Sequence, residues 1–225
     1  MTLPSRLAHV RWLAGGTGTG KSTVARLLAQ RYGVAVYDGD RAEHDWLRRC
    51  DPGRHPRLAA LGRPGAGGGS RGRTAEQVFR SMPGLYGETV GLLVEDLLDL
   101  PDDRIVVVDY FGLLPDHLAP LLPTPDHAAF LLPEPPFRRS VLTARYADPA
   151  RARANWGDAD PAAALALRLD RDALWDAEVR AGAERQGLPV LPVDGTVPPD
   201  VLAARVARAF GLAPRAHAPA GPTSP

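Results

Sequence analysis

The sequence predicts an α/β fold in which helices cover both faces of a five-stranded parallel sheet. Short apolar runs rich in valine and leucine alternate with longer stretches of helical apolar spacing, which is the pattern of parallel strands joined by crossover helices. A glycine-rich loop follows the first of these runs. The chain has 225 residues, of which 44% are hydrophobic, so it can bury a sizeable core. We expect a single domain over residues 1–212.

Each expected element has a local signal. Residues 9–14 form a short apolar run that enters the glycine-rich loop, and Val24, Leu27 and Leu28 recur at helical spacing after it. The other elements are assigned in the same way. Strands are expected near 9–14, 34–38, 104–109, 127–132 and 189–193, and helices near 21–32, 41–49, 74–82, 85–100, 134–147, 161–186 and 199–210. The segments rich in glycine and proline, 51–73 and 213–225, are expected to form a mobile loop and a disordered tail.

Composition narrows the class of protein. The single cysteine, Cys50, excludes an internal disulfide and a multi-cysteine metal site. No apolar run approaches the length needed to cross a membrane, and the N-terminus lacks a signal-peptide core, so we expect a cytoplasmic protein. The net charge is only +1, yet residues 46–80 carry eight arginines against Asp51 and Glu76. That segment requires an explanation of its own.

Residues 15–22, GGTGTGKS, match the phosphate-binding pattern G-x-x-x-x-G-K-[ST] at every fixed position. Glycines allow consecutive N–H groups to turn toward a polyphosphate, and the following helix adds its positive N-terminal end. Lys21 is the only lysine beside 26 arginines, and a compact ammonium fits such a loop better than a planar guanidinium. The alternative is an accidental match in a glycine-rich turn. The residues expected to bind the phosphates are Gly15, Gly16, Thr17, Gly18, Thr19, Gly20, Lys21, Ser22 and Thr23, with the Ser22 hydroxyl directed at Mg²⁺.

Acidic residues follow the second and third expected strands. Asp38 and Asp40 are two residues apart, and ligands gather beyond the carboxyl ends of parallel strands, so this is a suitable place for a base. The alternative for Asp40 is a helix-capping box with Glu43. Asp109 ends the strand RIVVVD, where a carboxylate can hold Mg²⁺. The alternative for Asp109 is a simple polar end to the strand.

The sequences GGTGTGKST, YDGD and VVVD resemble the small-molecule kinase branch of P-loop proteins, which includes shikimate, gluconate, adenylylsulfate and nucleoside monophosphate kinases and chloramphenicol phosphotransferases. The resemblance extends over residues 9–212 in organisation, and the P-loop is its specific motif. It implies a three-layer P-loop kinase sandwich with a lid and a substrate lobe, and it implies ATP and Mg²⁺ as cofactors. By this similarity Asp38 lies near Mg²⁺, Asp40 accepts the proton of the acceptor hydroxyl, and Asp194 and Gly195 lie in the loop beside adenine.

Such kinases close an arginine-bearing lid over the γ-phosphate, which excludes water. Residues 138–172 are the expected lid region. Within it Arg168 and Arg171 are three residues apart and would share one face of a helix, and we rank Arg171 first as a phosphate contact. The alternative is a solvated face on which these arginines pair with Asp172 and Asp176.

The substrate lobe of the related kinases corresponds here to residues 41–100. The arginines of this segment suggest an anionic or phosphate-bearing acceptor, since guanidinium groups bind such anions in a bidentate manner. Trp46, Phe79 and Tyr86 could stack on a ring of the acceptor, or they are ordinary core aromatics.

The function expected from these features is an ATP- and Mg²⁺-dependent phosphotransferase that moves the γ-phosphate to a hydroxyl or phosphate of a small molecule. The alternative is a nucleotide-gated regulatory protein that binds RNA through residues 63–73, RPGAGGGSRGR. Nucleic-acid binding would require an extended basic face, and a chain with a net charge of +1 is not expected to have one.

Overall fold

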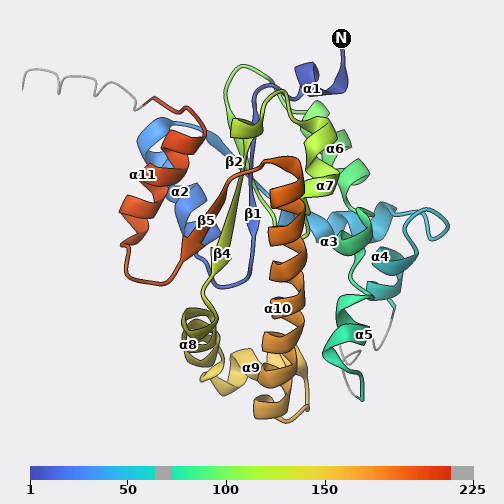
Figure 1. Ribbon diagram of the computed structural model, residues 1–225. Coiled ribbons are helices and arrows are strands. Elements are labelled where there is room, and N and C mark those ends of the chain that lie inside the picture. Colours follow the sequence, from blue (N-terminus) through green and yellow to red (C-terminus); the bar gives the residue numbers. More distant parts are fainter. Residues whose placement is uncertain (64–71, 214–225) are drawn as a thin grey trace, which may run out of the picture.

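The computed structural model describes residues 1–63 and 72–213 (Figure 1). Five strands form one sheet: β1 (Val10–Gly15), β2 (Ala35–Asp38), β3 (Val106–Asp109), β4 (Ala128–Pro133) and β5 (Val190–Val193). Their order is β2-β3-β1-β4-β5, and every neighbouring pair is parallel. The predicted α/β class with a five-stranded parallel sheet is therefore confirmed.

Helices cover both faces of this sheet. On one face α2 (Lys21–Tyr32) and α11 (Pro199–Ala209) pack against Leu13, Val107 and Leu131. On the other face α6 (Val90–Leu98) and the long α10 (Pro161–Gln186) pack against side chains that include Trp12. Successive residues of β1 enter opposite clusters because strand side chains alternate between the faces.

The remaining helices connect these elements, and three of them bury Trp46, Leu58 or Leu118 in the core. They are α1 (Leu3–Arg6), α3 (Gly39–Arg49), α4 (Pro56–Leu61), α5 (Ala75–Phe79), α7 (Pro115–Leu118), α8 (Pro135–Tyr146) and α9 (Pro149–Trp156), with short 3-10 turns η2 (Pro83–Tyr86), η3 (Ala119–Leu121) and η4 (Pro125–His127). Elements α3 to α6 connect β2 to β3, and α8 to α10 connect β4 to β5. Figure 1 shows α8, α9 and the first turns of α10 together below the carboxyl ends of the strands. No helix in residues 1–63 and 72–213 is long and apolar enough to cross a membrane.

The expected loop over residues 51–73 is wrong in its middle, because α4 forms there. Leu58 is completely buried in the core. The carboxylate of Glu88 accepts hydrogen bonds from the backbone N–H groups of Arg57 (2.9 Å) and Leu58 (3.0 Å), so a residue distant in sequence caps this short helix. Residues 64–71 of the expected loop and 214–225 of the expected tail lie outside the described residues.

Two expected helices also differ in detail. The helix expected over 85–100 begins only at Val90, because the turn η2 ends at Gly87, whose φ of 68° breaks helical geometry. The expected lid region contains a separate helix, α9, whose first turn is capped by the side chain of Asp148.

Candidate functional site

The loop between β1 and α2 lies at the centre of the sheet's carboxyl edge. Gly15 has a φ of 114°, and a Cβ at this position would collide with the backbone carbonyl of Leu131 in β4, so only glycine fits. Gly20 precedes α2, and no side chain of the described residues caps the first turn of that helix. Its N–H groups are therefore available to an anionic ligand.

Lys21 is buried inside the curve of this loop. Its ammonium donates hydrogen bonds to the carbonyl oxygens of Gly16 (2.7 Å) and Gly15 (3.4 Å). Burial lowers the pKa of Lys21, whereas the nearby carboxylates of Asp109 and Asp40 oppose that shift. The site therefore places one cation against two carboxylates.

Asp109 ends β3 and is buried. The hydroxyl of Ser22, in the first turn of α2, lies close enough to influence its pKa. Burial raises the pKa of Asp109, while the Ser22 hydroxyl and the Lys21 charge act in the opposite direction. A serine hydroxyl and a carboxylate from neighbouring elements thus meet beside the loop, as expected for these two residues.

Asp40 lies in the first turn of α3, and its carboxylate accepts a long hydrogen bond (3.5 Å) from the backbone N–H of Phe111. The carboxyl of Asp40 is surrounded by protein groups, although solvent still reaches it. Burial raises the pKa of this carboxyl, and the positive charge of Lys21 counteracts part of that rise. The negative charge of Asp38 repels a negative charge on Asp40 and so also raises the pKa of Asp40. The carboxyl of Asp40 is therefore more basic than an ordinary aspartate.

The alternative for Asp40, a capping box with Glu43, does not form, because Asp38 is the N-cap of α3. Its side chain accepts a hydrogen bond from the backbone N–H of Arg41 at 3.0 Å. Asp38 is opposite Asp109 in the register of β2 and β3, but it is exposed and does not line the cleft described next. Its expected role near Mg²⁺ stays a prediction.

A polar cleft of about 330 Å³ opens above the loop. The loop and the first turn of α2 contribute one side of it: Thr17, Gly18, Gly20, Lys21, Ser22 and Thr23. The opposite side consists of Asp40, Asp109, Phe111, Arg145 and Arg168. The structure thus brings together most of the residues that the sequence singled out. Thr19 supports the loop from behind, since its buried hydroxyl donates to the carbonyl oxygen of Gly16 at 3.1 Å.

Asp194 and Gly195 do not line this cleft. The side chain of Asp194 accepts hydrogen bonds from the backbone N–H (2.9 Å) and hydroxyl (2.8 Å) of Thr196, which closes a tight turn after β5. Gly195 packs against the ring of Phe137 in α8. Their expected contact with adenine stays a prediction.

Arg168 and Arg171 share a buried carboxylate, that of Asp172. Arg168 Nε donates to Asp172 at 3.0 Å, and Arg171 Nε donates to it at 2.8 Å. The alternative of a solvated face is therefore correct only in the pairing with Asp172: this cluster is largely buried, and Asp176 pairs with Arg138 of α8 instead. Burial alone would raise the pKa of Asp172, but the two guanidinium groups together hold it below its usual value.

The two arginines nevertheless point to different cavities. Arg168 lines the polar cleft, whereas Arg171 lines a second cavity next to it. Their expected convergence on one phosphate is therefore not seen in this arrangement, and Arg168 rather than Arg171 is the one beside the loop.

Two residues of the cleft were not singled out from the sequence. Arg145, near the end of α8, belongs to the expected lid but had no distinguishing signal there. Phe111 follows Asp109 by two residues, and an aromatic residue just after a strand end was the available signal. Its ring stacks on Trp175 of α10, with centroids 4.7 Å apart, and the Arg171 guanidinium lies 5.7 Å from its centroid.

The second cavity also has a volume of about 330 Å³, and Asp40 and Phe111 line both spaces. Its walls come mainly from the segment between β2 and β3. The other lining residues are Glu43, Leu61, Arg73, Val78, Ser81, Met82, Pro83, Gly84, Tyr110, Gly112 and Arg171.

Four of the seven described arginines of segment 46–80 are paired away from this cavity. They form ion pairs with acidic side chains: Arg48 with Asp45, Arg49 with Asp96, Arg57 with Glu88, and Arg80 with Glu76. Among the described arginines of the segment, Arg73 alone lines the second cavity. Within its described residues, the segment therefore does not present a cluster of arginines to this cavity.

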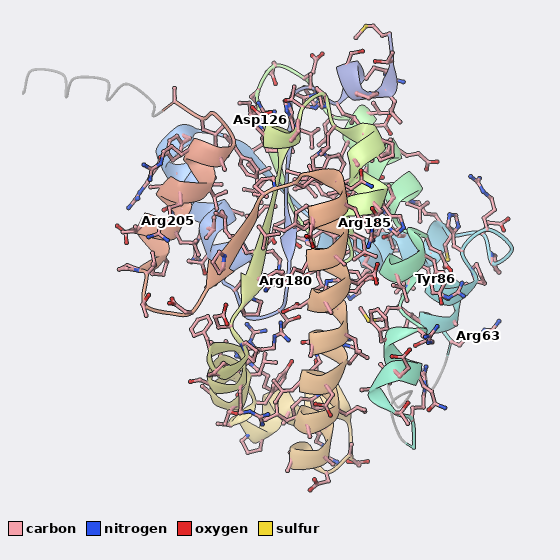
Figure 2. All side chains as sticks on the ribbon, in the orientation of Figure 1. Arg63, Tyr86, Asp126, Arg180, Arg185 and Arg205 are labelled. Atoms are coloured by element: carbon pink, nitrogen blue, oxygen red, sulfur yellow. The ribbon has the colours of Figure 1, made fainter. Side chains whose placement is uncertain are left out.

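The aromatic residues of the lobe are structural in this arrangement. Trp46 is completely buried, and its Nε1 donates to Asp96 at 2.7 Å. Phe79 packs against the core. Tyr86 is exposed at the outer edge of the molecule (Figure 2), with the Arg57 guanidinium 3.3 Å from its ring centroid. None of the three lines either cavity in the described part of the chain.

No protein-family model and no curated protein matches this sequence. Among solved structures, an uncharacterized protein from Eubacterium ventriosum ATCC 27560 is similar to this chain, with a TM-score of 0.42 and 14% sequence identity. The match covers 90% of this chain and 97% of the other.

Proposed function

We propose that this protein is an ATP- and Mg²⁺-dependent kinase that transfers the γ-phosphate to a hydroxyl group of a small molecule. The observation that carries the proposal is the position of Asp40, which lines both the polar cleft over the glycine-rich loop and the second cavity. A basic carboxylate between a phosphate site and an acceptor site is what phosphoryl transfer to a hydroxyl requires.

The fold supports the same proposal. The GGTGTGKS loop follows the central strand of a parallel sheet, and a helix begins at its end. This is the structural context in which the motif binds phosphate. We assign the sheet and its two helical layers to the P-loop kinase sandwich, with α3 to α6 as the substrate lobe and α8 to α10 as the lid.

The charges around the cleft suit a nucleoside triphosphate. Lys21 and the free N–H groups of α2 lie on one side, and Arg145 and Arg168 reach the cleft from the lid elements on the other. Positive groups on both sides of a narrow polar cleft can neutralise phosphate oxygens that neither side could neutralise alone.

Ser22 and Asp109 would hold Mg²⁺. Both offer oxygen ligands, which Mg²⁺ prefers, and both line the polar cleft beside the loop. Within the described residues no group of three or more His, Cys, Asp or Glu side chains could hold a metal. When bound, Mg²⁺ supplies charge neutralisation at the phosphate oxygens.

Asp40 then accepts the proton of the acceptor hydroxyl. The hydroxyl oxygen forms a bond to the γ-phosphorus, the bond from that phosphorus to the β–γ bridging oxygen breaks, and ADP departs. Lys21 and Arg168 stabilise the charge on the moving phosphoryl group, while the closed lid excludes water that would otherwise hydrolyse ATP. The raised pKa of Asp40 makes its carboxylate a better proton acceptor at neutral pH.

The test is transfer from γ-labelled ATP to a panel of hydroxylated metabolites, nucleosides, nucleotides and antibiotics, with the wild type and the variants Lys21→Ala and Asp40→Asn. We expect a labelled acceptor with the wild type and none with Lys21→Ala. If no acceptor is labelled while an RNA ligand binds tightly at physiological salt, the regulatory alternative replaces this proposal.

A further inference from the structure

The second cavity indicates the chemical class of the acceptor. Apolar side chains of the lobe, Leu61, Val78, Met82 and Pro83, line it together with the ring of Phe111. A wall of this kind favours a ring or another apolar body, since burial of apolar surface stabilises binding and polar groups then fix the orientation.

The charged groups of the cavity favour a cation over an anion. Asp40 and Glu43 are three residues apart on α3, so both carboxyls lie on one face of that helix and line the cavity. Of the two arginines that line it, Arg171 is bound to the buried Asp172, and Arg73 Nη2 donates to the carbonyl oxygen of Gln77 at 2.5 Å. A phosphate or carboxylate in this cavity would therefore be repelled by two carboxylates, while the charge of Arg171 is largely offset by Asp172 and Arg73 contributes one positive charge.

Glu43 differs from most other acidic residues of the lobe. Asp45, Glu76, Glu88 and Asp96 each form an ion pair, whereas Glu43 makes no hydrogen bond or ion pair with any residue in 1–63 and 72–213. It is half-buried, and burial, followed by the negative charge of Asp40, raises its pKa, while His44 opposes that rise. A half-buried carboxylate that lines a cavity without a partner is positioned to accept a hydrogen bond from a ligand.

We propose that the acceptor is an amino alcohol with an apolar or ring-shaped body and without a phosphate group, and that Glu43 determines this specificity by accepting a hydrogen bond from its ammonium group. This inference rests on the proposed kinase function and replaces the anionic acceptor suggested by the arginine content of the lobe. The hydroxyl of the acceptor faces Asp40, the apolar body contacts the lobe, and the ammonium contacts Glu43.

A matched set of acceptors tests the charge preference. The compounds 2-amino-1-phenylethanol, 1-phenyl-1,2-ethanediol and mandelic acid share a ring and a secondary hydroxyl and differ in charge. A wider panel of ring-bearing amino alcohols, polyols, hydroxy acids and phosphate monoesters extends the comparison. Initial rates of transfer from γ-labelled ATP give kcat/KM for each compound, and we expect the amino alcohols to rank first in both sets.

Glu43→Gln then tests the residue, with Asp45→Asn as its control, because Asp45 is a solvent-exposed residue of the same helix and lines neither cavity. Loss of a charge-assisted hydrogen bond should lower kcat/KM for the best amino alcohol by about 10- to 100-fold, mainly through KM. We expect Glu43→Gln to lower transfer to the corresponding diol much less than transfer to the amino alcohol, because only the amino alcohol loses a charge-assisted bond, and Glu43→Asp to restore part of the loss. Circular dichroism should show that the Glu43 and Asp45 variants are folded, since neither of these two side chains contributes to the core.

The outcomes separate the two proposals. A preference for hydroxy acids or phosphate esters, or an unchanged kcat/KM for the amino alcohol in Glu43→Gln, overturns the assigned acceptor class and leaves the kinase proposal intact. No transfer to any class, although a thermal shift shows that ATP with Mg²⁺ binds, overturns both proposals.

Discussion

The side-chain nitrogen of Lys21 lies 2.7 Å from the backbone carbonyl oxygen of Gly16, within the loop that joins β1 to α2. The ammonium thus occupies the inside of the loop's curve. A nucleotide phosphate that enters the cleft would offer it a stronger acceptor than two backbone carbonyls, because a charge-assisted hydrogen bond exceeds a bond to a neutral group. Under the proposed function, this arrangement would explain why the chain has a lysine here and arginine elsewhere.

Lys21→Arg should therefore fail in transfer nearly as completely as Lys21→Ala. The substitution preserves the charge, but a planar guanidinium is too large for the space inside the loop. We expect kcat/KM to fall by about 10²-fold or more. Enzymes lose activity to this extent when one fixed hydrogen-bond donor to the charge of the transition state is removed. Steady-state kinetics measure this, and circular dichroism should show an unchanged fold. Wild-type turnover in Lys21→Arg would contradict this explanation.

Asp40→Asn should separate catalysis from nucleotide binding. The amide keeps the shape of the side chain but cannot accept a proton, so transfer should fall by about 10²–10⁴-fold. Affinity for ATP with Mg²⁺, measured by isothermal titration calorimetry, should change little. Full transfer in this variant would exclude Asp40 as the base.

The pH dependence should report the raised pKa of Asp40. Because burial raises this pKa, kcat/KM should fall as the pH decreases through a value above the usual range of aspartate. Activity should rise with pH, whereas the stability of the fold should fall. A carboxyl with a raised pKa destabilises the folded state when it ionises, as the pH rises through that pKa. The ligand-free Asp40→Asn variant should therefore melt at a higher temperature than the wild type at pH 7 and at nearly the same temperature below pH 3.8, the unperturbed value. Differential scanning calorimetry at the two pH values checks this.

The sheet and the long helices were predictable because their signals are local. The helix over 161–186 has the bounds expected from the sequence, since Pro161 begins it and Gly187, with a φ of 63°, ends it. The helix α4 was not predictable, because it consists of six residues and depends on the burial of Leu58 and on the distant cap from Glu88.

The candidate site was predictable where residue types follow a strict motif, as in the loop from Gly15 to Ser22. It was not predictable where two residues of the same type suit the same role and only the tertiary structure determines which of them lies in the site. Asp38 and Asp40 are both suitable N-caps, and only the path of the chain after β2 makes Asp38 the cap and leaves Asp40 to line the cleft. In the same way, both Arg168 and Arg171 lie on α10 and bind Asp172, but Arg168 lines the polar cleft and Arg171 lines the second cavity.

Asp172→Asn should destabilise the protein and reduce its sensitivity to acid. The carboxylate is fully buried between Arg168 and Arg171, whose side chains are 25% and 14% exposed, and its removal leaves two largely buried guanidinium groups without a charged partner. The free energy of unfolding in urea should fall by about 3–5 kcal/mol at pH 7. Because the pKa of Asp172 is lowered, its contribution is present above pH 3.8 and is lost as the pH decreases below that value. The difference between variant and wild type should therefore shrink in acid, and a constant difference would contradict this.

Arg168→Ala and Arg171→Ala should affect different steps, and each variant is the control for the other. Both arginines lie on α10 and bind Asp172, so the loss of either leaves that carboxylate with one partner and should cost similar stability. Arg168 lines the cleft over the loop, so its removal should lower kcat and weaken ATP binding, by about 10- to 100-fold in kcat/KM for ATP. Arg171 lines the second cavity and lies beside the Phe111 ring, so its removal should mainly raise KM for the acceptor. Steady-state kinetics with each substrate varied in turn distinguish these effects. Equal effects of the two substitutions on both substrates would show that the arginines act as one unit through Asp172, and the assignment of Arg168 to the phosphates would then be wrong.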